Sequence, residues 1–83
     1  MSIHGKVKSA KTGKGISDAV VTAKTSGTEI ETEISDDEGR FKFGFRPMPG
    51  YTYDVHLEHE DFHPTTVSGI GPGDHEFAME PVR

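Results

Sequence analysis

The chain has 83 residues, no cysteine and a formal net charge of −5 at pH 7. A chain this short encloses one core, so a single domain over residues 1–83 is expected, and the lack of cysteine excludes disulfides, thiolate metal sites and cysteine nucleophiles. The acidic balance argues against a nucleic-acid partner, because binding to phosphates needs clustered lysine and arginine.

The hydrophobic residues are mostly of types that favour strands. Valine and isoleucine together occur eleven times and threonine eight times, whereas Leu57 is the only leucine. Branching at Cβ suits a pleated surface better than a helix, and ten glycines and five prolines interrupt the chain. The composition therefore predicts many short strands.

The N-terminus and the apolar runs bear on location. No run approaches the ~18 apolar residues of a membrane span, and residues 1–6 lack the apolar core of a signal peptide. We expect no insertion into a membrane. The protein is expected to be cytoplasmic if Met1 is the native start, and extracytoplasmic if the segment is excised from an exported chain.

Alternation with period two predicts three strands in the first half of the chain. Residues 3–8, 19–24 and 28–35 alternate between apolar and polar side chains, which is typical of half-buried strands. A turn at residues 12–15 separates the first two. In the third strand, one face holds Ile30, Thr32 and Ile34, and the other holds Glu29, Glu31 and Glu33.

The centre of the chain carries the strongest core signal. Residues 36–39, Asp-Asp-Glu-Gly, predict a tight hairpin turn, because acidic side chains accept hydrogen bonds from nearby N–H groups and Gly39 can adopt positive φ. Phe41, Phe43 and Phe45 follow at period two, so we expect this face in the core. Residues 47–50, Pro-Met-Pro-Gly, then end the pairing.

Three further strands complete the prediction. Tyr51, Tyr53, Val55 and Leu57 alternate with polar residues, and residues 65–68 and 75–80 supply the last two strands. Seven strands at spacings of about 8–12 residues predict an all-β fold, a Greek-key sandwich of two antiparallel sheets.

Four short motifs carry a resemblance to a known family. Residues 3–7 and 12–21 match an opening strand with a glycine, a Gly-Lys turn and a strand that starts at Ala-x-Val. Residues 35–43, Ser-Asp-Asp-Glu-Gly-Arg-Phe-Lys-Phe, and the corner Pro49-Gly50 match the next two motifs. In this order and spacing, the chain resembles carboxypeptidase regulatory-like domains, with Asp61 where the family usually has glycine.

This resemblance implies a transthyretin-like, or prealbumin-like, sandwich of seven strands. Members are usually non-catalytic modules fused to peptidases, surface proteins, transporters, secretion components or oxidoreductase subunits. We therefore expect a non-enzymatic scaffold or protein-interaction module, as an accessory domain of a larger protein or assembly. Function does not follow from fold, so alternatives stay open.

Histidines and carboxylates gather late in the chain and form the one candidate metal site. Its members are His56, Glu58, His59 and His63. His56 and Glu58 would share a strand face and could bind a divalent metal with a neighbouring residue. No helix aligns the other two histidines, so a solvated face is the favoured interpretation, and no metal or other cofactor is expected.

No catalytic motif is present. The serines lie outside any Gly-x-Ser-x-Gly elbow, and residues 69–73 lack the following helix of a phosphate loop. Transthyretin-like folds include hydroxyisourate hydrolases, which carry a C-terminal Tyr-Arg-Gly-Ser signature and paired histidine and arginine. Residues 79–83 lack that signature and His4 alone is a weak match, so no catalytic residue is assigned.

A protein partner is expected, bound at a sheet edge, a sheet face or the loops at residues 48–51 and 70–74. The chain is expected to be a monomer or an edge-strand homodimer. A small-ligand cleft between subunits is one alternative, supported by Val20 and Ile70 as the clear outward apolar residues. A carbohydrate-binding module is another, with Tyr51 as the aromatic residue expected to reach the surface.

Overall fold

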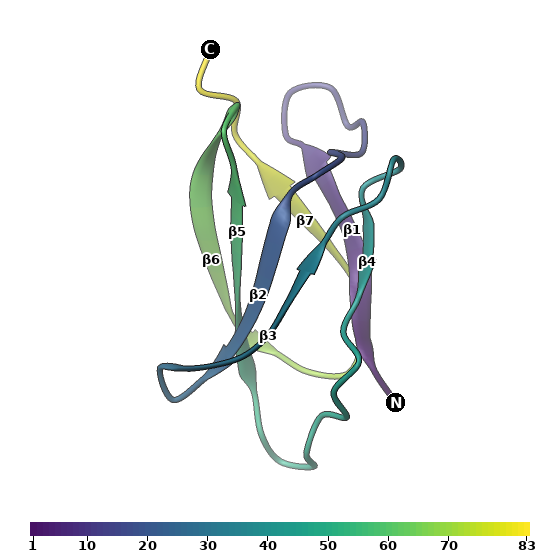
Figure 1. Ribbon diagram of the computed structural model, residues 1–83, viewed down its shortest axis with the longest axis vertical. Helices are drawn as coiled ribbons and strands as arrows, with labels where there is room; N and C mark the ends of the chain where they lie inside the picture. Colours follow the sequence, from purple (N-terminus) through teal and green to yellow (C-terminus); the bar gives the residue numbers. More distant parts are fainter.

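The computed structural model describes residues 1–83 and contains seven strands and no helix (Figure 1). The strands are β1 (Ile3–Ser9), β2 (Val20–Thr25), β3 (Thr28–Ile34), β4 (Arg40–Lys42), β5 (Tyr53–His59), β6 (Phe62–Ile70) and β7 (Gly73–Met79). The structure thus offers no helix that could span a membrane.

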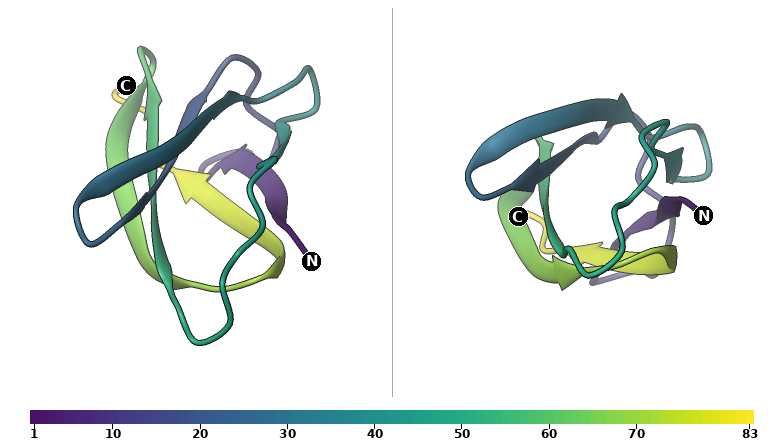
Figure 2. Two further views of the ribbon diagram at one scale, coloured as in Figure 1. Left: turned by 60° about the horizontal axis from the view of Figure 1, so that its bottom comes forward. Right: turned by 90° about the horizontal axis from the view of Figure 1, so that it is seen from below.

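The strands form two sheets. One has three strands in the order β4-β1-β7, and the other has four in the order β3-β2-β5-β6. Hairpins join β2 to β3 and β5 to β6, and the other connections pass from one sheet to the other. Figure 2 shows the strands arranged around the core. The predicted all-β sandwich of seven strands is confirmed.

One strand pair departs from the antiparallel expectation. β1 and β7 run parallel, from Ile3 opposite Gly73 to Ser9 opposite Met79. β7 enters this sheet by crossing over from β6 in the other sheet, so no hairpin fixes its direction against β1.

The core holds fourteen buried hydrophobic residues, and β3 contributes none of them. Phe41 and Phe43 are buried as predicted, with ring centroids 5.5 Å apart, and Phe45 packs partly buried against them. The side chain of Ser35 is buried too. Its Oγ donates a hydrogen bond to the Ile16 carbonyl at 2.6 Å, and it accepts one from the Ala19 N–H at 2.9 Å.

The turn at residues 36–39 forms, but the predicted hairpin does not. The strands that flank it lie in different sheets, since β3 pairs with β2 and β4 pairs with β1. Asp36 Oδ1 accepts hydrogen bonds from two backbone N–H groups that follow it, at 2.9 and 2.8 Å. Gly39 has a φ of 84°, and its carbonyl accepts the N–H of Val7. The turn therefore packs on β1 and carries the chain from one sheet to the other.

The second half of the chain differs from the prediction in its strand limits. β4 ends at Lys42, so the backbone of Phe43 and Phe45 lies beyond it. β6 reaches Ile70 and leaves only residues 71–72 of the predicted 70–74 loop before β7. Ile70 is buried, although it was expected to face outward. Gly69, with a φ of 75°, lies where the end of β6 turns toward the core.

Candidate functional site

The outer face of the four-stranded sheet carries exposed apolar side chains. Ile34 is 55% exposed, Ile30 37% and Val20 36%. Val20 and Ile34 are Cα partners in the β2–β3 ladder, so their side chains share one face. Apolar groups that gather on one surface, rather than singly, are typical of interaction sites. Val20 was predicted to face outward, whereas the two isoleucines were missed.

Glu31 and Glu33 of β3 occupy its inward side. Glu31 lies opposite Ala23, a fully buried core residue, and therefore points to the same side of the sheet. Its carboxylate accepts hydrogen bonds from the N–H groups of Gly44 at 2.7 Å and Phe45 at 2.9 Å. These two N–H groups follow β4 and lie outside any strand, so the carboxylate takes the place of a pairing strand. Because these two N–H groups need an acceptor, Glu31 lies on the inward side of β3, and Ile34 on the opposite side faces solvent.

Ionisation of Glu31 is linked to that of Glu33, two residues further on the same side. Burial opposes ionisation of Glu31, but hydrogen bonds from Gly44, Glu33 and Phe45 outweigh it and hold its pKa below the ordinary 4.5. The hydrogen bond to Glu31, together with burial and repulsion by the Glu31 charge, raises the pKa of Glu33 above 4.5. As the pH falls, Glu33 therefore takes up a proton before Glu31, which stays ionised against the amides.

β3 is an edge strand, with β2 on one side and no strand on the other. The N–H of Ser35 donates to the Ala19 carbonyl and so points toward the β2 side. Backbone groups of successive residues in a strand point in opposite directions, so those of Thr32 and Ile34 point to the free edge. These N–H and C=O groups can pair with an added strand.

Polar side chains form hydrogen bonds across the middle of the same outer face. The hydroxyls of Thr22 and Thr32 lie 3.2 Å apart. On β5, Nε2 of His56 lies 3.1 Å from a Glu58 carboxylate oxygen, and its Nδ1 lies 2.7 Å from the Thr66 hydroxyl. Because an ionised carboxylate can only accept, Nε2 carries the hydrogen that it donates to Glu58. These contacts hold the side chains in place beside the apolar residues.

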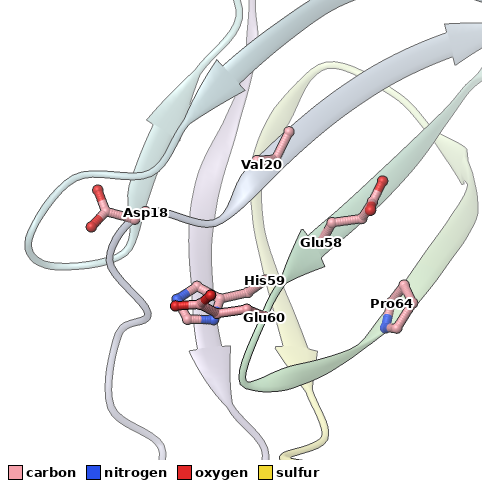
Figure 3. Close-up of a pocket in the computed structure, with 6 residues that line it drawn as sticks. All are labelled: Asp18, Val20, Glu58, His59, Glu60 and Pro64. Atoms are coloured by element: carbon pink, nitrogen blue, oxygen red, sulfur yellow. The ribbon is translucent and has the colours of Figure 1, made fainter.

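A groove of about 440 Å³ lies at the end of this face (Figure 3). Figure 3 shows Val20 and Glu58 at its centre, with His59 and Glu60 below them. Asp18 completes the acidic rim; it has a φ of 63° and its N–H donates to the Ser35 carbonyl at 3.1 Å. The groove is acidic, with three carboxylates and one histidine among the residues Asp18, Val20, Glu58, His59, Glu60 and Pro64.

The structure brings together only part of the candidate metal site. His56 and Glu58 are in contact on the outer face, as predicted. The ring of His59 instead packs edge-on against Phe62, with centroids 5.3 Å apart, and His63 is exposed on β6. No group of three or more histidine or carboxylate side chains is arranged to hold a metal ion.

The outer face of the three-stranded sheet is basic. His4 lies opposite Lys42 in the β1–β4 ladder, and Lys6 lies opposite Arg40, so the like charges of Lys6 and Arg40 are direct neighbours. β7 supplies two carboxylates, Asp74 and Glu76, which form ion pairs with Arg40 and Lys8 at 3.6 and 2.7 Å. A second hollow, of about 390 Å³, lies here and is lined by Ser2, His4, Gly5, Asp36, Arg40, Phe41 and Lys42.

The predicted contact loop at residues 48–51 forms an exposed tip between β4 and β5, at the bottom of Figure 1. Met48 and Tyr51 are each 57% exposed, and a hydrogen bond from the Tyr51 N–H to the Met48 carbonyl closes the turn. Tyr51 therefore reaches the surface as predicted. Tyr53 does not, because its ring is buried and its hydroxyl accepts the Met48 N–H at 2.9 Å.

Residues 2–78 match the family model of the carboxypeptidase regulatory-like domain. The chain belongs to this family. The resemblance carried by the four sequence motifs is thus confirmed. No curated protein matches the domain.

Two solved structures share the fold of this carboxypeptidase regulatory-like domain. 5-Hydroxyisourate hydrolase from Klebsiella pneumoniae superimposes with a TM-score of 0.76 at 15% identity, over 98% of this chain and 91% of that one. A candidate carbohydrate-binding protein from Bacteroides uniformis ATCC 8492 gives a TM-score of 0.70 at 24% identity, over 96% of this chain and 41% of that one. The transthyretin-like fold that the resemblance implied is therefore confirmed, and at these identities the likeness concerns the fold alone.

Proposed function

We propose that this domain is a non-catalytic protein-interaction module that binds its partner through the outer face and free edge of the four-stranded sheet. The observation that carries the proposal is the exposure of Ile34 and Val20, side by side, next to an unpaired strand edge. Burying apolar surface contributes roughly 25 cal/mol per Å². An unpaired edge adds directional hydrogen bonds that fix the register of a partner.

The inventory of reactive side chains supports a non-catalytic role. There is no cysteine, and the one hydrogen bond between a serine and a histidine joins Ser2 Oγ to His4 Nδ1 at 3.0 Å. The other ring nitrogen of His4 lies 3.7 Å from Asp74, which is beyond hydrogen-bond reach. A catalytic triad needs that carboxylate to orient the ring, so His4 is poorly equipped as a base.

The test is affinity capture from the producing organism with the immobilised domain, followed by reconstitution with the purified partner. Ile34→Lys should abolish binding, whereas Met48→Lys, an equally exposed apolar residue at the distant tip, should leave it unchanged. A partner that binds the Ile34→Lys variant as tightly as the wild type contradicts the proposed surface.

A second candidate function, binding of a small anion, is favoured by the basic hollow on the three-stranded sheet. Like charges directly opposite each other destabilise a sheet, and a bound carboxylate or phosphate would relieve the repulsion between Lys6 and Arg40. Titration with citrate and inorganic phosphate should then shift NMR signals of the hollow in the wild type but not in Arg40→Gln, with Lys24→Gln as control. 5-Hydroxyisourate is a further probe, and its hydrolysis dependent on His4 would overturn the non-catalytic assignment.

A further inference from the structure

We infer that the partner adds an extended segment to β3 as a fifth strand, and that this segment alternates basic and apolar residues. This inference rests on the proposed function and names the chemistry of the partner. Three features of β3 carry it: its free backbone groups, its exposed isoleucines and its charge.

The free edge can accept a strand. β3 has seven residues and contains neither proline nor lysine, two residue types that commonly block edge pairing. Its backbone groups at Thr32 and Ile34 point away from β2, as the bond from Ser35 to Ala19 requires. The register shift opposite Ala23 and Lys24 leaves the run from Glu31 to Ile34 regularly paired to β2. This run is where a new strand would form its hydrogen bonds.

The side chains beside that run favour a partner with two different faces. On the outer face, Ile34 is exposed and would pack against an apolar side chain of the added strand. On the other face, Glu33 and Glu31 would lie beside basic side chains. The alternation of β3 therefore calls for a partner that alternates lysine or arginine with valine or isoleucine.

The charge of the neighbourhood strengthens this choice. Residues 29–38 contain six acidic side chains and no basic one: Glu29, Glu31, Glu33, Asp36, Asp37 and Glu38. The whole chain has a net charge of −5. Electrostatic attraction would therefore speed association with a basic segment. A second copy of this domain is disfavoured, because pairing two β3 strands would bring these carboxylates together.

The experiment uses the intact domain and two capped peptides of the length of β3, one alternating lysine with valine and one alternating glutamate with valine. In NMR titrations the lysine peptide should shift the Thr32 and Ile34 amides and slow their hydrogen exchange. The glutamate peptide should leave both unchanged. Equal binding of the two peptides, or protection at another edge only, overturns the inference.

Variants separate the backbone and charge requirements. Thr32→Pro removes an edge N–H without removing a backbone hydrogen bond to β2, and it should abolish peptide binding. Glu33→Lys should lower the affinity for the lysine peptide about threefold, which corresponds to one cross-strand charge pair of about 0.6 kcal/mol. Glu80→Lys, at an exposed glutamate that follows β7 and lies in neither sheet, is the matched control and should leave binding unchanged. If Thr32→Pro fails to fold, as judged by circular dichroism, Glu33→Lys and its control still decide the charge requirement.

The two proposals can fail separately. A partner that is lost with Ile34→Lys but retained by Thr32→Pro and Glu33→Lys supports binding at the outer face and overturns strand addition. Retention by all three variants overturns both. Self-association at neutral pH through β3, detected by light scattering and abolished by Thr32→Pro, would replace the basic segment with a second copy.

Discussion

The carboxylate of Glu31 accepts the backbone N–H of Gly44 at 2.7 Å, and this contact joins an edge strand of one sheet to the segment that leaves the other. A second bond, from Phe45, uses the other carboxylate oxygen. One side chain therefore accepts hydrogen bonds from two backbone donors in the segment between β4 and β5. Its inward position also determines that Ile30 and Ile34 of β3 face solvent.

Glu31→Ala should destabilise the domain by about 1–2 kcal/mol, because it leaves two N–H groups without their charged acceptor in a partly solvated site. Urea denaturation at neutral pH measures the loss. Glu29→Ala is the control, since Glu29 accepts a hydrogen bond only from the exposed Thr32 hydroxyl, and it should cost less than about 0.5 kcal/mol. Equal losses for both variants would mean that the Glu31 bonds contribute nothing specific.

The two linked glutamates should give opposite pH dependences. The pKa of Glu31 is lowered in the folded state, so its contribution is present above pH 4.5 and lost as pH falls through the folded value. Glu31→Gln should therefore be less stable than the wild type at neutral pH, and the difference should shrink in acid.

The pKa of Glu33 is raised, so its contribution is complete below pH 4.5 and lost as pH rises through the folded value. Glu33→Gln keeps the neutral form at every pH, and its stability relative to the wild type should increase from acid to neutral pH. Thermal denaturation over a pH series checks both signs. A parallel response of the two variants would contradict the assigned hydrogen bonds.

The strand pattern of this chain could be predicted from its sequence, but the role of β3 could not. Phe41 and Phe43 were placed in the core correctly, because aromatic residues at period two have one obvious side to bury. In β3 the same period separates two faces without saying which is inward. Ordinary burial preference would choose isoleucine, whereas the unpaired N–H groups of Gly44 and Phe45 required a carboxylate there.

The connection after β3 shows the same limit. Residues 36–39 have the composition of a hairpin turn, and the local hydrogen bonds of Asp36 form as expected. Whether the next strand pairs with β3 or crosses to β1 depends on contacts far away in the sequence, such as that between Val7 and Gly39. The hydrogen bonds within the turn do not determine which of these two strands it pairs with. The position of His59, whose ring packs on Phe62, likewise depends on the fold and could not be inferred from the spacing of the histidines.

Phe43→Ala should cost about 3–5 kcal/mol, close to the whole stability of so small a domain. The side chain is 1% exposed and its ring lies 5.5 and 5.6 Å from those of Phe41 and Phe45. Circular dichroism and urea denaturation report the loss. Phe43→Leu is the milder variant if the alanine form does not fold, and an unchanged midpoint in either would contradict the placement of the core.

Two glycines with positive φ offer a matched test of the turn that joins the sheets. Gly39 and Gly27 have φ values of 84° and 78°, but only at Gly39 would a Cβ meet backbone, 2.3 Å from the Val7 carbonyl oxygen. Gly27→Ala should cost about 1–2 kcal/mol for the left-handed conformation alone. Gly39→Ala should cost clearly more, because the turn must move off β1. Equal costs, measured by thermal denaturation, would exclude the close approach.

Hydrogen exchange along β3, measured by NMR with and without the captured partner, tests the central claim most directly. In the free domain the amides of Thr32 and Ile34 should exchange fast, while that of Glu33, which points to β2, should be protected. With the partner bound, protection should appear at Thr32 and Ile34. If these two amides stay fast in the complex and protection arises elsewhere, such as the tip at residues 48–51, then β3 is not the interaction surface.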